Sequence, residues 1–288
     1  MRRLFVAALV ASMMLVPASQ AIASPHHPTG EFAPFGDCPL SHATVAACVF
    51  SESNGGYFQM GAKKVPLVNP VILQGGLEFN AKGESTFVGA EDGNTLSKTP
   101  QPVPGGLLGV EAPSWWPSWL KNWFNETINQ GLTGVTATVE LAAPASAIKV
   151  NTLNLIIENG TALSLPVKIK LSNPFLGSSC YIGSNSKPVT IDFTTGATSP
   201  PPPNKSIHGS KGELFVNETG TLVKLSGGQL VNNSFAAPGA SGCGGLLSFL
   251  IDPFVNSIVG LPSAAGTNTA ILEGVLETGD AAAVKASE

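Results

Sequence analysis

Charged side chains are scarce in this sequence. They make up 12% of the 288 residues, about half of the quarter that is usual in globular domains. The formal net charge is −4, and no cluster of Lys and Arg stands out along the chain. Because nucleic acids and anionic lipid surfaces are bound through such clusters, we expect no nucleic acid among the partners of this protein.

Histidine and the common catalytic motifs are also scarce. The four histidines are His26, His27, His42 and His208. The sequence has no G-x-S-x-G elbow, no P-loop and no dinucleotide fingerprint, so we expect no catalytic residue, no metal site and no cofactor. Sequence separation does not fix spatial separation, however, so paired carboxylates stay open. A secreted hydrolase with a site assembled from scattered residues is therefore the alternative to a protein that is not an enzyme.

Only one long apolar run occurs, and it lies at the N-terminus. After Met1-Arg2-Arg3, residues 4–16 are almost entirely apolar, and Ala21 and Ala23 follow in small-x-small contexts. These features are typical of a secretory signal peptide, whereas a membrane span needs about 20 apolar residues. We predict a signal peptide over residues 1–23 and no transmembrane segment, so that the mature protein is secreted or held in the cell envelope.

The sequence contains four cysteines. They are Cys38, Cys48, Cys180 and Cys243. An even number of cysteines in an exported chain predicts two disulfides, with three possible pairings. We favour Cys38–Cys48, which closes a short loop, together with Cys180–Cys243, which ties two distant segments. The spacings do not fit the C-x₂₋₄-C pairs of zinc sites.

Alternation of apolar and polar residues dominates the rest of the sequence and predicts half-buried strands. Val135–Leu141 is the clearest case. Residues 153–158 and Leu163–Leu171 flank Asn159-Gly160, a strong hairpin signal, and Pro166 indicates an edge strand or a bulge there. Further strands are predicted over residues 65–73, 77–80, 86–88, 189–193, 213–216, 222–225 and 269–276.

These strands predict an all-β fold, an antiparallel β-sandwich or barrel-like sandwich with one or two short accessory helices. We expect one β-rich domain over residues 24–276, followed by a flexible C-terminal tail over residues 277–288. The 32 glycines and 23 prolines fit the many turns that such a fold needs. The proline run at Ser199–Asn204 leaves open a subdomain break near residue 200.

A pair of helices is predicted over residues 244–251 and 253–259. Asp252 is a suitable N-cap for the second helix, Pro253 suits its first turn, and Gly260 suits its end. The segment is apolar on all sides, so we expect it to be buried.

All four tryptophans lie between positions 115 and 123. On a helix over residues 116–130, with its start near Ser114 and its end near Gly131, one apolar stripe contains the candidate binding residues Trp116, Trp119, Trp123 and Phe124. The stripe either packs across an open end of the sandwich or is partly exposed and binds. As an occupant, we favour an apolar ligand or a protein partner over a membrane surface, because the polar face of the helix is not basic.

Five strings add a resemblance. They are VPGGLLG at 103–109, VTATVELA at 135–142, NPFLGSSCYIGS at 173–184, TTGATSPPPPN at 194–204 and LPSAAGTNTAILEG at 261–274. Together they resemble a group of uncharacterised secreted actinobacterial proteins, which implies export and a β-rich fold but no activity. We therefore predict an exported non-enzymatic protein, with a secreted hydrolase and a peripheral membrane-surface protein as alternatives.

Overall fold

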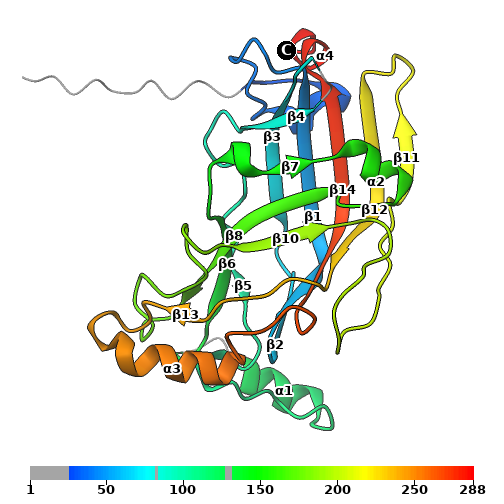
Figure 1. The fold of residues 1–288 in the computed structure, drawn as a ribbon. Coiled ribbons are helices and arrows are strands. Elements are labelled where there is room, and N and C mark those ends of the chain that lie inside the picture. The colour runs from blue at the N-terminus through cyan, green and yellow to red at the C-terminus, as the bar shows by residue number, and fades with distance from the viewer. Residues whose placement is uncertain (1–25, 82–83, 127–131) are drawn as a thin grey trace, which may run out of the picture.

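The computed structural model describes residues 26–81, 84–126 and 132–288, so the predicted signal peptide over residues 1–23 lies outside the described part of the chain. Two antiparallel sheets face each other, and the strands of one run across those of the other (Figure 1). The predicted all-β sandwich with short accessory helices is confirmed.

The first sheet, sheet A, has the strand order β11-β12-β14-β1-β3-β4, and β2 also pairs with β1. Its strands are β1 (Ala47–Met60), β2 (Lys63–Pro66), β3 (Val71–Phe79), β4 (Ser85–Gly89), β11 (Glu213–Val216), β12 (Leu222–Asn232) and β14 (Thr269–Asp280). Sheet A thus combines strands from both sides of residue 200, where the sequence left a subdomain break open.

The second sheet, sheet B, has the order β13-β9-β8-β6-β5, and β10 and β7 also pair with β8. Its strands are β5 (Gln101–Pro102), β6 (Thr136–Leu141), β7 (Lys149–Val150), β8 (Leu163–Ser172), β9 (Tyr181–Ile182), β10 (Val189–Phe193) and β13 (Ala240–Ser241). Side chains from both sheets, including Leu77, Val167 and Phe193, form one continuous core between them.

Short helices lie at the ends and sides of the sandwich. The α-helices are α1 (Ser118–Phe124), α2 (Thr152–Ile157), α3 (Ser248–Val259) and α4 (Ala281–Ala286), and the 3-10 turns are η1 (Gly30–Phe35), η2 (Gly106–Leu108), η4 (Ala145–Ala147) and η5 (Gly245–Leu247). Helices α1 and α3 lie at one end, whereas α4 and the C-terminus lie at the other (Figure 1). None of the helices in the described part of the chain is long and apolar enough to cross a lipid bilayer.

Both favoured disulfides are present. Cys38–Cys48 spans 10 residues of sequence, and Cys180–Cys243 spans 63. Disulfides form and persist in oxidising compartments, so they agree with a protein that works outside the cytosol.

The sequence does not predict β1, the longest strand. Its apolar alternation is interrupted by a β-bulge between Ser53 and Gly55, in a stretch whose glycines resemble a turn. At Gly56 φ is +95°, and a Cβ there would lie 2.1 Å from the carbonyl oxygen of Ile271 in β14. Only glycine fits this approach of two strands, so the glycine belongs to the strand rather than ending it.

Two local predictions near β8 are wrong. The strand predicted over residues 153–158 is the helix α2, because Asn151 caps its first turn by accepting a hydrogen bond from the Asn154 N–H. Pro166 lies inside sheet B, not at its edge. The Pro166 carbonyl accepts a hydrogen bond from the Ala142 N–H, one residue beyond the end of β6. The hydrogen-bond ladder between β6 and β8 stops at this point, so the N–H that proline lacks is not needed there.

The C-terminal residues 277–288, predicted to be a flexible tail, are structured in their greater part. Residues 277–280 complete β14, and α4 follows with Asp280 as its N-cap. Val284 of α4 is fully buried beside Phe35. The sequence pattern misses this helix because its residues are small.

Candidate functional site

The tryptophan-rich segment lies at one end of the sandwich, on α1. The helix begins at Ser118, after Pro117, rather than at residue 116, and residues 127–131 of the predicted helix lie outside the described residues. Trp116 and Phe124 are half-buried and pack edge to face, with ring centroids 5.6 Å apart. This contact fixes the inner side of the segment.

The indole rings on the outer side of α1 are exposed to water. Trp119 is 70% exposed and Trp123 is 55% exposed, and Trp115 just before the helix is also exposed. The predicted stripe is therefore divided: Trp116 and Phe124 are half-buried and pack against each other, whereas Trp119 and Trp123 face water. Lys121 donates a hydrogen bond to the Ser114 carbonyl at 2.9 Å, which ties the helix to the segment before it.

A second exposed apolar surface lies on η5 and α3. Leu246 is 97% exposed and Phe249 is 70% exposed. Leu247, Leu250 and Phe254 are exposed as well. The prediction that this segment is buried is therefore wrong, and so is its division into two helices, because α3 runs without a break through Pro253.

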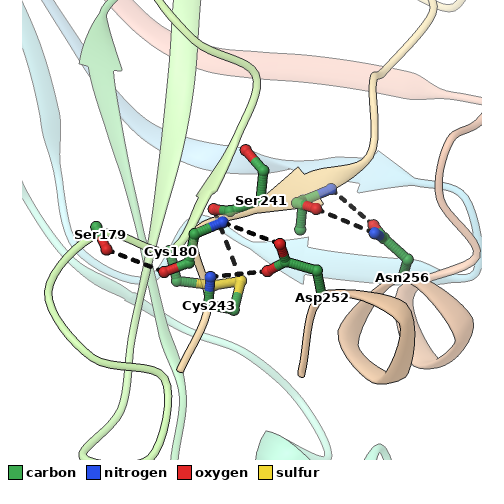
Figure 2. Close-up of a disulfide and its surroundings, with 8 residues drawn as sticks. Ser179, Cys180, Ser241, Cys243, Asp252 and Asn256 are labelled. Carbon is green, nitrogen blue, oxygen red and sulfur yellow. Dashed lines mark hydrogen bonds between the residues drawn. A yellow bond between two sulfur atoms is a disulfide. The ribbon is translucent and has the colours of Figure 1, made fainter. Parts of the chain in front are cut away.

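Two polar side chains of α3, Asp252 and Asn256, point inward (Figure 2). The two carboxylate oxygens of Asp252 accept from the backbone N–H groups of Cys243 at 2.7 Å and Gly242 at 3.2 Å. Asn256, one turn later, accepts from the Ala240 N–H at 2.6 Å and donates to its carbonyl at 3.0 Å. Asp252 is thus not an N-cap but a contact in the middle of the helix.

A surface helix usually has its apolar side chains toward the protein and its polar ones toward water. Helix α3 departs from this pattern because both of its sides are apolar: Ile251, Val255 and Val259 pack against the core, and the exposed side is apolar as well. The cause lies in the loop beneath α3. Backbone N–H groups shielded from water need a partner, and those of Ala240, Gly242 and Cys243 find it in Asp252 and Asn256. The same helix rotation leaves Phe249, Leu250 and Phe254 outside.

Helix α3 is firmly attached at several points. The Cys180–Cys243 disulfide joins the segment before it to sheet B, and the Ser179 hydroxyl donates to the Gly242 carbonyl beside that bond (Figure 2). Val255 is buried on the inner face, and Gly260 ends the helix at φ +74°, as predicted. The outer apolar side chains are therefore held in place on a fixed support.

Helices α1 and α3 both border Val103, which lines one hollow beside α1 and another beneath α3. We call the exposed apolar side chains of this region the apolar end. They are Trp115, Trp119, Trp123, Leu246, Leu247, Phe249, Leu250 and Phe254. Few charges accompany them: Lys121 and Glu126 lie on the α1 side, and Asp252 is occupied by backbone groups.

The hydrolase alternative receives less support from the geometry. Within the described residues, the ring of His208 contacts only the neighbouring Gly209 carbonyl, and His42 makes no side-chain hydrogen bond. A hollow of about 930 Å³ contains the carboxylates of Glu84 and Asp192, and that of Asp192 accepts a hydrogen bond from the Ser164 hydroxyl at 2.5 Å. In the described ranges, no group of three or more His, Cys, Asp or Glu side chains is placed to hold a metal ion.

One carboxyl group at the opposite end has a shifted pKa. Burial raises the pKa of Asp37, the negative charge of Asp92 raises it further, and a hydrogen bond from Gln74 opposes the change. Asp37 precedes Cys38, whose disulfide partner Cys48 pairs with the end of β14, just before α4. The shift therefore belongs to the packing of that end and not to the candidate site.

No protein-family model, curated protein or solved structure matches this chain. The resemblance to secreted actinobacterial proteins stays a prediction. The sequence predicts helical structure at both α1 and α3, but it does not predict the exposed apolar side of α3. The available signal was the i, i+4 spacing of Asp252 and Asn256, which places the only acidic residue of α3 and an amide on one side of the helix.

Proposed function

We propose that this is an exported, non-enzymatic protein that attaches to a lipid surface through its apolar end. The observation that carries the proposal is the exposed apolar side of α3. Asp252 and Asn256 bind the loop beneath the helix, and large apolar side chains face out although others of the same helix already pack against the core. A signal-peptide-like N-terminus and two disulfides support the exported location.

The exposed side chains need a partner. Contiguous exposed apolar patches larger than a few hundred Å² are rare on soluble monomers and mark binding sites for proteins or membranes. Full burial of a wholly exposed Phe or Leu stabilises by about 1.5–3 kcal/mol. Phe249, Leu250 and Phe254 are 70%, 59% and 47% exposed, so each would gain roughly half of that or more. The loop contacts of Asp252 and Asn256 prevent α3 from turning to bury them against the protein itself.

A lipid surface fits this end better than a small ligand does. The side chains stand on the outer faces of two helices rather than around a hollow, and Trp is favoured where hydrocarbon meets lipid headgroups. The lack of a basic face weakened this hypothesis at the level of sequence. Helix α3 changes the balance, because interfacial binding also grows with the apolar area that is buried, and a zwitterionic lipid requires no basic charge.

The test is flotation of the protein with phosphatidylcholine vesicles. We expect the protein to float with the vesicles, and the combined variant Phe249→Ser/Leu250→Ser/Phe254→Ser to lose at least about tenfold in partition coefficient, which corresponds to about 1.4 kcal/mol. The matched control is Leu214→Ser/Phe215→Ser, which removes two equally exposed apolar side chains from the edge strand β11.

The control variant is expected to float like the unsubstituted protein. If the unsubstituted protein stays in the aqueous fraction, the proposal is wrong, and the apolar end must bind something other than a zwitterionic lipid. Equal losses in both variants would also contradict it, because binding would then follow general hydrophobicity and not the place of α3.

A further inference from the structure

A wide hollow lies on the side of the sandwich, where the edge strand β4 of sheet A meets β7 and α2. We call it the side hollow. Its volume is about 930 Å³, at the upper end of the range of about 300–1,000 Å³ that is usual for ligand sites. Strands β8 and β10 also contribute to its lining. Because β7 and α2 lie well away from α1 and α3 along the sandwich (Figure 1), the side hollow is separate from the apolar end.

Three polar side chains form a row across the side hollow. In the register of sheet B, Lys149 of β7 lies opposite Ser164 of β8, and Ser164 lies opposite Asp192 of β10. Residues directly opposite each other share one face of a sheet. The adjacent residues Leu163 and Phe193 belong to the core, so the row projects from the outer face of sheet B. We call these three residues the polar row.

The two charges of the polar row do not neutralise each other. They stand two strand spacings apart, about 9–10 Å, and within the described ranges neither takes part in an ion pair. Oδ1 of Asp192 accepts from the Ser164 hydroxyl at 2.5 Å, which leaves Oδ2 to accept from a ligand. The ammonium group of Lys149 adds three donors. The row therefore offers donors at one end and an acceptor at the other.

The rest of the lining is rich in hydroxyl groups and firmly held. The hydroxyl groups belong to Ser85, Thr86, Ser146, Thr152 and Thr161. The Ser85 hydroxyl donates to the Val150 carbonyl at 2.8 Å, which ties sheet A to β7. The Asn151 side chain caps α2. A second carboxylate, that of Glu84, accepts from the Asn80 amide at 2.7 Å. The side hollow is thus a preformed surface with many polar groups.

Two apolar side chains border these polar groups. Phe79 is 49% exposed and Leu153 is 63% exposed, and both line the side hollow. The face of an aromatic ring carries negative partial charge, so Phe79 can attract the C–H face of a sugar ring. An aromatic ring beside donors and acceptors matches the two kinds of surface that a sugar presents.

We propose that the side hollow binds a neutral polysaccharide, with sugar hydroxyl groups at Lys149 and Asp192 and a sugar ring against Phe79. A hydroxyl group is both donor and acceptor, so the same ligand group satisfies the ammonium group and the carboxylate. The distance between the two charges exceeds one sugar ring, which favours a chain of sugars over a monosaccharide.

Other polymers fit the side hollow less well. Asp192 and Glu84 repel a polyanion, and their two negative charges exceed the single positive charge of Lys149. Extended peptides usually pair with a strand edge or place side chains in apolar pockets, whereas the polar row runs across the face of sheet B. The neutral polysaccharide is therefore the ligand class that the lining favours.

The test is titration of the ¹⁵N-labelled protein with three neutral hexasaccharides: maltohexaose, cellohexaose and N-acetylchitohexaose. We expect at least one of them to bind with a Kd of about 1 mM or lower. The amide shifts should concentrate at residues 149–153, 161–164 and 192. Absence of binding for all three, or shifts confined to another part of the chain, would overturn the proposal.

Substitutions test the polar row itself. Lys149→Ala and Asp192→Ala each remove a charged hydrogen-bonding partner and are expected to raise the Kd about tenfold or more. The matched control is Lys170→Ala, which removes an amine from the same strand β8 but from outside the lining, and its Kd should not change. Thermal unfolding checks that the variants fold. An unchanged Kd in a folded Lys149→Ala variant would overturn the assignment of the row.

This inference does not rest on the proposed function, and two measurements keep them apart. The combined variant Phe249→Ser/Leu250→Ser/Phe254→Ser is expected to bind the hexasaccharide normally although it no longer floats with vesicles. Lys149→Ala is expected to float normally although it binds the hexasaccharide weakly. Loss of hexasaccharide binding in the combined variant would contradict the separate place of the side hollow.

Discussion

The two ends of the sandwich are built from similar parts but expose opposite chemistry. Each end has a disulfide and a helix: Cys38–Cys48 with α4 at one, which we call the closed end, and Cys180–Cys243 with α3 at the other. At the closed end, Val284 of α4 is buried with Phe35, and Asp280 caps the helix from its exposed start. At the apolar end the polar residues are inside.

This difference shows that the apolar content of a helix does not decide which side it buries. Helix α4 covers a hydrophobic gap, so its apolar residues turn inward. Helix α3 covers a loop whose backbone N–H groups need acceptors, so Asp252 and Asn256 turn inward. An unpaired buried backbone group costs about as much as a lost hydrogen bond. Ile251, Val255 and Val259 of α3 still pack against the core, and its other large apolar side chains are left for an external surface.

The largest effect is expected from the disulfides. Replacing both Cys180 and Cys243 by Ser removes a link across 63 residues, whereas replacing Cys38 and Cys48 removes one across 10. Loop-closure entropy predicts losses of about 4 and about 3 kcal/mol in the free energy of unfolding, respectively. Denaturation in urea measures both. A larger loss at the closed end would contradict the loop-closure account, in which the bond that spans more residues stabilises more.

The next effect comes from the inward polar contacts. Asp252→Ala leaves the N–H groups of Gly242 and Cys243 without their acceptor and is expected to cost about 1–3 kcal/mol. Asp280→Ala removes only a helix cap at the closed end and is expected to cost about 1 kcal/mol. Urea denaturation compares the two variants, and amide exchange at Gly242 and Cys243 should accelerate in Asp252→Ala alone.

Substitution of apolar residues distinguishes the ends directly. Val284→Ala is expected to cost about 2 kcal/mol, because two buried methyl groups lose about 0.8 kcal/mol each and a cavity is left. Phe254→Ser removes a much larger side chain, yet its cost should stay at about 1 kcal/mol, because about half of the ring is already exposed and only the buried part is lost. Thermal unfolding of the two variants checks this order. A Phe254→Ser loss equal to that of Val284→Ala would mean that α3 is part of the core.

The smallest effect concerns pH at the closed end. Because burial and the charge of Asp92 raise the pKa of Asp37 above its ordinary value of 3.8, the folded state binds this proton more tightly than the unfolded state does. The charged form therefore lowers stability at neutral pH, and the loss is relieved as pH falls through the raised pKa towards 3.8. Asp37→Asn should raise the melting temperature slightly at pH 7, and this difference from the unsubstituted protein should disappear below pH 3.8. Thermal unfolding across this pH range measures it.

The sequence was sufficient where a local pattern and the tertiary environment agree. The alternation in β6, β8 and β10 predicted those strands, and the cysteine spacing favoured the correct disulfides. The sequence was insufficient where a segment distant in the chain determines the local structure. The bulge of β1 is formed against β14, and the face of α3 is chosen by the loop at residues 240–243. The sequence of α3 alone does not show that the loop beneath it has backbone N–H groups in need of acceptors.

The central claim is that the apolar end enters a lipid surface, and the tryptophans test it most directly because all four lie between positions 115 and 123. Intrinsic fluorescence should show emission typical of exposed indoles in buffer. On addition of phosphatidylcholine vesicles, the account predicts a shift to shorter wavelength and protection from iodide quenching. An emission maximum and a quenching constant that are unchanged at saturating lipid would contradict it.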